Sequence, residues 1–139
     1  MQKEKSCGLI IFRRDNGLKF LLLCYRHGHW GFIKGHVEQG EKDKETVSRE
    51  TKEETSITNF NFINYFKEDI SYTFKENNKS IFKEVTFYLA ETKEEDVKLS
   101  SEHTDYKWLN FDDALKLLSF NNTKALLKKA HLLITKDIK

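Results

Sequence analysis

Apolar residues recur in short runs along the chain, and these runs predict β-strands. Residues 6–14 and 19–26 contain GLIIF and FLLLCY, and the Asp-Asn-Gly turn between them indicates a β-hairpin. Two more strands are predicted near residues 62–74 and 82–91, joined by the turn ENNK. In the second of these, apolar side chains alternate along the strand, namely Val85, Phe87 and Leu89.

Three segments carry helical signals. The acid-rich stretch 43–56 follows a loop, residues 27–41, that contains four glycines. After a short strand in YKWLNF, a second helix is predicted from Phe111 with Asn110 as its N-cap, and a last helix runs through residues 123–134. The predicted strands outnumber the predicted helices, and the helices fall in the middle and at the end of the chain. This order predicts an α/β fold in which a mixed β-sheet is sandwiched between α-helices.

Length and charge narrow the class of protein. The 139 residues suit one domain, predicted to span residues 1–139, and 24 basic against 22 acidic residues give a formal net charge of only +2. Dedicated nucleic-acid binding is therefore not expected. The apolar run near the N-terminus is too short for a signal or membrane span, so we expect a cytoplasmic, soluble, monomeric protein without membrane contact.

Three acids crowd the predicted helix 43–56. A helix advances about 100° per residue, so relative to Val47 the side chain of Glu54 lies at about −20° and that of Glu50 at about −60°. Both acids border the apolar side of the helix, Glu53 adds a third carboxylate beside them, and no lysine on the same face offsets their repulsion. A hard divalent cation such as Mg²⁺ would offset it, and phosphate chemistry commonly accompanies Mg²⁺. The alternative is a solvated acidic face.

The same stretch resembles the Nudix box, G-x5-E-x7-R-E-U-x-E-E-x-G-U, in which U is bulky and apolar. Two positions depart from that pattern, with Thr51 at an apolar position and Ser56 in place of the usual glycine, which affects the backbone where the helix ends. The matching positions are Gly35, Glu41, Arg49, Glu50, Glu53, Glu54 and Ile57.

The resemblance implies a Nudix fold and a metal-dependent hydrolase acting on a nucleoside diphosphate linked to another group. It implies Mg²⁺, with Mn²⁺ as an alternative, held by Glu53, Glu54 and the carbonyl of Lys34. Glu50 would be a further ligand or the base for the attacking water. Arg49 and Glu41 would orient the acids and brace the loop.

Beyond the box, the segments SCGLIIFRR, HW…KGHVE, FYLAE and SEH..YKWL resemble the asymmetrical diadenosine tetraphosphate hydrolases of this family. The likeness implies a small nucleotide substrate, diadenosine tetraphosphate, split by water into ATP and AMP. It also implies site residues outside the box. They are Lys34, His36 and Lys83 for the phosphates, with Lys79 as a weaker candidate, Glu102 as an additional metal ligand, and Tyr72 and Phe120 as rings that sandwich an adenine.

Each of these residues also has an interpretation without a function. The charged residues could be ordinary surface groups, and the aromatic residues could be rings of the hydrophobic core. Two alternatives remain within the same chemistry. One is an RNA 5′-pyrophosphohydrolase, for which the 5′ end of an RNA would be the partner, and the other is a nucleoside-triphosphate pyrophosphatase. A non-catalytic nucleotide-binding module is the alternative from another class, although retention of Arg49, Glu50, Glu53 and Glu54 argues against it.

Overall fold

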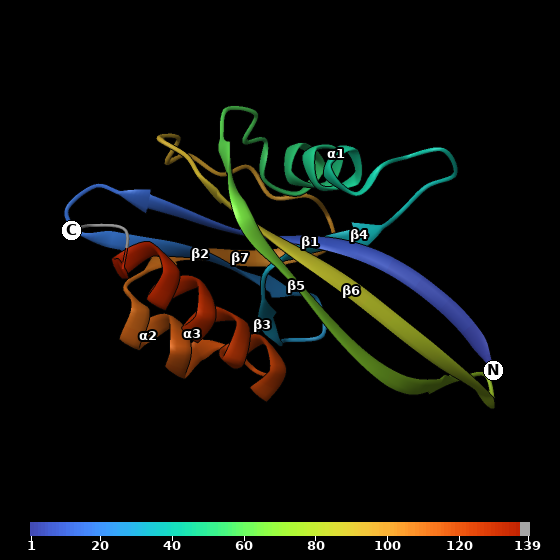
Figure 1. Ribbon diagram of the computed structural model, residues 1–139. Coiled ribbons are helices and arrows are strands. Elements are labelled where there is room, and N and C mark those ends of the chain that lie inside the picture. Colours follow the sequence, from blue (N-terminus) through green and yellow to red (C-terminus); the bar gives the residue numbers. More distant parts are fainter. Residues whose placement is uncertain (137–139) are drawn as a thin grey trace.

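The computed structural model describes residues 1–136, which form one β-sheet with helices on both faces (Figure 1). The strands are β1 (Gln2–Arg14), β2 (Leu18–Tyr25), β3 (Trp30–Gly31), β4 (Ile33–His36), β5 (Asn61–Glu76), β6 (Lys79–Glu91) and β7 (His103–Leu109). The helices are α1 (Asp43–Thr55), α2 (Phe111–Leu117) and α3 (Asn121–Lys136).

The sheet is mixed, as the order of elements predicts. Its strand order is β3-β2-β1-β6-β5, while β4 pairs with β1 and β7 pairs with β2. The pairing of β1 with β6 is parallel and runs from Gln2 opposite Ile81 to Phe12 opposite Glu91, whereas the other pairings are antiparallel. The central strand β1 therefore connects the two halves of the sheet.

Burial on both faces explains the continuous apolar run in β1. Successive side chains of a strand point to opposite faces, so Leu9 and Ile11 pack with Val47 of α1. On the other face, Ile10 and Phe12 pack in the cluster that α2 and α3 cover. Figure 1 shows α1 above the sheet and α2 and α3 below it.

The turns and caps predicted from the sequence are present. The β1–β2 hairpin turns through Asn16 and Gly17, and the β5–β6 hairpin turns through Asn77 and Asn78, with positive φ at all four residues. Asn110 caps α2, because its side chain accepts a hydrogen bond from the Asp113 N–H at 2.9 Å.

The structure corrects the prediction that residues 27–41 form only a loop. This segment contains β3, which pairs with β2, and β4, which pairs with β1 from Ser6 opposite His36 to Leu9 opposite Ile33. Glycines and polar residues mask the strand pattern here, because the pairing depends on partners elsewhere in the chain.

Ser56 takes the place of a helix-ending glycine. It lies in the left-handed region, with φ 68° and ψ 5°, and its N–H donates to the Lys52 carbonyl at 2.9 Å. The serine therefore adopts the backbone conformation that glycine adopts at lower cost, and the end of α1 keeps the geometry of a left-handed cap.

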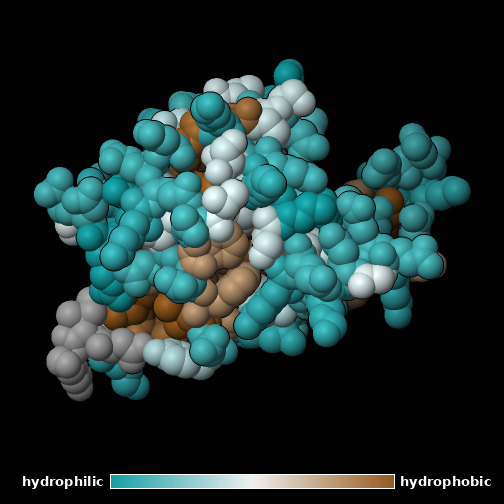
Figure 2. Space-filling model, turned by 90° about the horizontal axis from the view of Figure 1, so that it is seen from above, coloured by the Kyte–Doolittle hydropathy of each residue, from teal (hydrophilic) through white to brown (hydrophobic). Residues whose placement is uncertain are grey.

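The surface seen from the α1 side is mainly hydrophilic, interrupted by a few apolar areas (Figure 2). Within residues 1–136, we find no helix that is both long and apolar enough to cross a membrane.

Candidate active site

A glycine of β4 allows α1 to pack closely against that strand. A Cβ at Gly35 would overlap the side chain of Glu50, so only glycine lets that carboxylate lie against the strand. Glu50 is largely shielded, with 14% of its side chain exposed. The strand-loop-helix unit thus fixes Glu50 from both sides.

Arg49 gathers the acids around one guanidinium group. Its Nε lies 2.7 Å from Oε2 of Glu41, and its Nη1 lies 2.8 Å from Glu50 and 3.4 Å from Glu53. Its Nη2 also donates to the carbonyl of His36 at 3.0 Å. These contacts tie α1 to the preceding loop and to β4.

Glu41 is the second residue that holds α1 and the preceding loop together. It accepts hydrogen bonds from Arg49, from the backbone N–H of Glu38 at 2.9 Å and from the Thr46 hydroxyl at 2.8 Å. These hydrogen bonds lower the pKa of Glu41 to about 2. Glu41 therefore stays ionised and holds the loop rather than facing the cavity that the other acids line.

Glu54 is only 2% exposed and, among the described residues, forms no ion pair with a lysine or an arginine. Neither of its carboxylate oxygens has a hydrogen-bond partner among the described residues. Burial, reinforced by the negative charges of Glu50, Glu102 and Glu53, raises the pKa of Glu54 to about 10.

His103 is the neutral neighbour of Glu54. Its Nε2 lies 3.2 Å from Oε1 of Glu54 without the angle of a hydrogen bond, and its Nδ1 lies 3.4 Å from Oγ of Ser100. Burial lowers the pKa of His103, so the imidazole does not supply the positive charge that the Glu54 carboxylate lacks.

This arrangement corrects one step of the sequence argument and supports another. The acids are not all without a cation, because Arg49 compensates Glu50 and Glu53. Glu54 forms no such ion pair within the described part of the chain, although its charge acts on Lys34 from a longer distance, and its unpartnered oxygens suit a hard divalent ion. Within residues 1–136, no three His, Cys, Asp or Glu side chains are already gathered into a metal site. Exposed Glu53 would have to turn from Arg49 toward a bound ion.

The turn before β7 brings Glu102 to the same place. The N–H of Lys98 donates to the Thr55 carbonyl at 3.0 Å and that of Ser100 to the Glu54 carbonyl at 3.4 Å, which satisfies carbonyls at the end of α1. Arg26 donates from its Nε to the Ser101 carbonyl and from its backbone to the Glu102 carbonyl. The turn is thus fixed at both ends.

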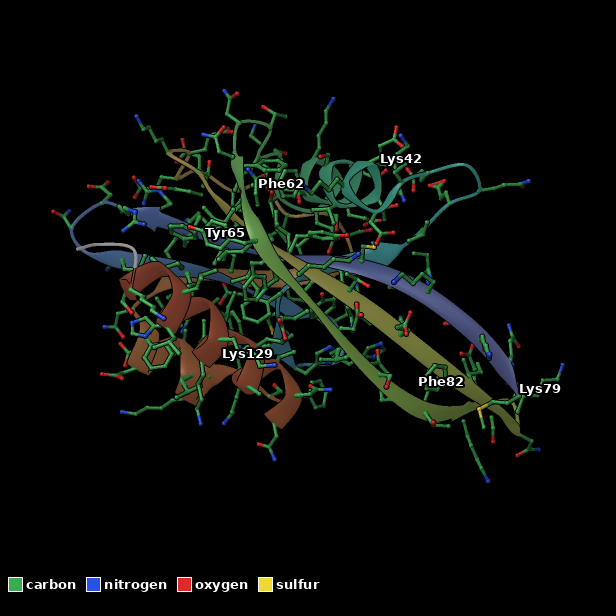
Figure 3. The ribbon with its side chains drawn as sticks, viewed as in Figure 1. Lys42, Phe62, Tyr65, Lys79, Phe82 and Lys129 are labelled. Atoms are coloured by element: carbon green, nitrogen blue, oxygen red, sulfur yellow. The ribbon has the colours of Figure 1, made fainter. Side chains whose placement is uncertain are left out.

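A polar cavity of about 530 Å³ collects most of the predicted charged residues. Glu41 does not line it, and Lys79 lies at the tip of the β5–β6 hairpin, at the far end of the sheet (Figure 3). The predicted residues that line the cavity are Lys34, His36, Arg49, Glu50, Glu53, Glu54, Lys83 and Glu102.

A second, mainly apolar cavity of about 370 Å³ holds both predicted aromatic residues. Tyr72 comes from β5, where it stands opposite Lys83, and Phe120 comes from the connection between α2 and α3. Hydrogen bonds between Ser119 and Trp30 hold that connection to β3. The structure therefore brings together two rings from distant parts of the sequence.

The two cavities adjoin, because Tyr25 and Lys34 line both of them. The Lys34 ammonium lies 3.5 Å from the Tyr72 hydroxyl and 5.8 Å from the centre of the Tyr25 ring. Burial lowers the pKa of Lys34, partly offset by Glu54. Such an arrangement suits a molecule with a flat apolar group at one end and a polyanion beside it.

Sequence reasoning missed several contributors to these cavities. Tyr25 ends a strand pattern and His29 sits in a glycine-rich stretch, so neither carries a recognisable signal of its own. His103 was noticed only as the neighbour of Glu102. Further missed residues line the apolar cavity from separate elements, namely Gly31, Phe32, Ile70, Val85, Phe87, Asn122 and Thr123, and three more line the polar cavity, namely Ser6, Glu38 and Ser100.

Comparison with known families gives one clear match. The NUDIX domain matches residues 3–130. Among curated proteins, the asymmetrical bis(5′-nucleosyl)-tetraphosphatase of Sus scrofa is 41% identical over 140 residues, which cover 91% of this chain and 92% of the relative. The protein of the same name from Caenorhabditis elegans is 38% identical over 129 residues, covering 90% and 92%.

Solved structures agree in fold. A binary complex of the Ap4A hydrolase of Caenorhabditis elegans has a TM-score of 0.85 at 34% identity, covering 96% of this chain and 98% of that one. The NUDIX domain of NrtR from Shewanella oneidensis, solved with ADP ribose, has a TM-score of 0.77 at 17% identity, covering 96% and 90%, and shares the fold.

Proposed function

The chain belongs to the NUDIX domain family, and from that premise we propose that it hydrolyses diadenosine tetraphosphate with water to ATP and AMP. The curated relatives named asymmetrical bis(5′-nucleosyl)-tetraphosphatase support this substrate, because they match along nine-tenths of the chain.

The observation that carries the proposal is the junction of the two cavities. An adenine between Tyr72 and Phe120 would fill the apolar cavity, and the phosphates would extend past Lys34 into the polar cavity. Stacking on aromatic side chains contributes about 1–3 kcal/mol per base in nucleic-acid complexes. The base would therefore be held at a fixed place relative to the acids.

The acids facing the polar cavity would hold Mg²⁺, or Mn²⁺ in its place. The ligands would be Glu53, Glu54, Glu102 and the carbonyl of Lys34, which leaves Glu50 available as the base. When bound, such an ion polarises phosphoryl oxygens and lowers the pKa of a bound water.

The side chains of this protein would supply the base and offset the charge on the phosphates. Glu50, fixed between Gly35 and Arg49, would take the proton of the attacking water, a role that typically contributes about 10²–10⁴-fold. Lys34, His36 and Lys83 would offset the charge that develops on the phosphates. Arg49 and Glu41 would orient the acids of α1 and hold the preceding loop in place.

Chromatography of the products made from diadenosine tetraphosphate tests the proposal. We expect ATP and AMP in equal amounts with Mg²⁺, and no activity in chelator. Replacing Tyr72 or Phe120 with alanine should raise KM far more than it lowers kcat, since both rings would bind ground and transition states alike. A pair of ADP molecules from the wild-type protein would contradict the asymmetric cut.

The same assay with 5′-triphosphorylated RNA and nucleoside triphosphates addresses the two alternative hydrolase activities, and absence of turnover on every substrate would favour a binding module. A single domain over residues 1–139, a monomeric state and a cytoplasmic location stay predictions.

A further inference from the structure

Tyr25 stands where the two cavities meet, and four contacts immobilise it. Its hydroxyl donates to the Phe32 carbonyl, and its ring stacks on His29 with centroids 4.6 Å apart and planes at 12°. The ring of His103 approaches at 4.5 Å and 59°, and the Lys34 ammonium lies 5.8 Å from the Tyr25 ring centre. A ring held from so many sides has little freedom to move.

The backbone also directs Tyr25 into this position. The pairing of β2 with β7 shifts register between Cys24 and Tyr25, an irregularity of the kind that re-aims a side chain. A tight turn follows, closed by hydrogen bonds from the Tyr25 N–H to the His29 carbonyl at 2.9 Å and from the Gly28 N–H to the Tyr25 carbonyl at 2.8 Å.

The contacts of Tyr25 reach both functional ends of the site. On one side His29 contacts Phe120 of the apolar cavity, with ring centres 5.2 Å apart. On the other side His103 lies 3.2 Å from the Glu54 carboxylate of the polar cavity. The ring therefore occupies the space between the place of the base and the place of the acids.

We propose that Tyr25 is a specificity-determining residue, a rigid spacer that sets which phosphate of a dinucleoside polyphosphate lies at the acids. This inference rests on the proposed function. Water attack that breaks the bridge between the first and second phosphates puts the water hydroxyl on one phosphorus, and the bridging oxygen leaves with the other fragment, giving AMP and ATP. Breaking the central bridge in the same way gives two ADP.

Truncation of the ring opens one cavity into the other and lets the phosphate chain bind one unit further along. Tyr25→Ala should therefore release ADP in addition to ATP and AMP, with the ratio of asymmetric to central cleavage falling to about ten to one or lower. Tyr25→Leu, which fills more of the space without a ring, should shift the ratio in the same direction. Tyr25→Phe keeps the ring and should keep the ATP and AMP pattern, with a lower melting temperature.

Tyr106 provides the matched control. It is a half-buried tyrosine on β7, the neighbouring strand, and its ring packs in the α1-side cluster, outside both cavities. Tyr106→Ala should lower the melting temperature without producing ADP. Product ratios measured by ion-exchange chromatography on variants with a cooperative melt provide the readout.

The outcomes separate the two claims. If the wild-type protein makes no ATP and AMP from diadenosine tetraphosphate, the proposed function fails, and the inference with it. If the wild-type protein makes them and neither Tyr25→Ala nor Tyr25→Leu releases ADP, the inference alone is overturned. Release of ADP by Tyr106→Ala as well would also overturn it, because the effect would then reflect general loosening of the fold.

Discussion

Replacing Glu54 with glutamine should stabilise the protein in chelator while removing its activity. Glu54 is buried, and its pKa is raised from 4.5 to about 10. In the unfolded chain the carboxyl loses its proton near pH 4.5, whereas in the folded protein it keeps the proton until about pH 10. Folding at intermediate pH therefore requires uptake of a proton, and stability falls as pH rises through this window.

The loss of folding free energy follows from the pH range between the two pKa values of Glu54. Each pH unit above 4.5 costs about 1.4 kcal/mol, so at pH 7 the acid costs about 3 kcal/mol of folding free energy. The cost depends on the carboxylates around Glu54, because their negative charges help to raise its pKa. Glutamine has nearly the same shape and no charge, so Glu54→Gln should recover much of this cost.

Urea unfolding in chelator at pH 5, 6, 7 and 8 measures the effect. The wild-type free energy of unfolding should fall over this range, and that of Glu54→Gln should fall much less. The control is Glu45→Gln, on the same helix, where the side chain is exposed and does not contribute to the raised pKa of Glu54; its pH dependence should match the wild type. A Glu54→Gln protein that keeps the wild-type pH dependence, or that keeps its turnover, would refute the reasoning.

Three further substitutions probe α1. Glu50→Gln should lower kcat by about 10²–10⁴-fold with little change in KM, and steady-state kinetics showing only a few-fold loss would move the base role elsewhere, with Glu102 next. Gly35→Ala should expel the Glu50 side chain and lower kcat, while circular dichroism stays native; full activity would contradict the close packing. Thr51 is fully buried and its hydroxyl lacks a partner among the described residues, so Thr51→Val should raise the free energy of unfolding by about 1 kcal/mol without changing activity, and a destabilised variant would contradict this.

Local chemistry made much of the fold predictable. The Asn-Gly turn, the Asn-Asn turn and the Asn110 cap each act within a few residues, so the sequence around them is sufficient. The period of α1 also placed Glu54 correctly at the edge of the apolar side. By contrast, β3 and β4 exist because distant strands pair with them, and their own residues carry no strand pattern.

In the candidate active site, too, features set by local sequence were predictable and features set by distant contacts were not. The acids of α1 were predictable from their spacing and from the family resemblance. The resemblance also implied that Arg49 orients these acids, whereas the spacing argument considered only lysine on the same helical face and left Arg49 out. The long Arg49 side chain reaches around the helix to Glu41 and to β4. Tyr25 and His103 become visible as neighbours only after β2 and β7 pair.

The parallel pairing of β1 with β6 has a consequence for how the chain folds during synthesis. It joins residues 79 positions apart, such as Lys5 and Glu84, so the edge of the β1–β2 hairpin stays open until β6 has left the ribosome. Contacts of such long range slow folding, and an exposed apolar strand edge in that interval can pair with other chains. Stalled chains that end before residue 79 should therefore be protease-sensitive and prone to aggregate, whereas chains released after residue 109 contain all the strands of the described sheet.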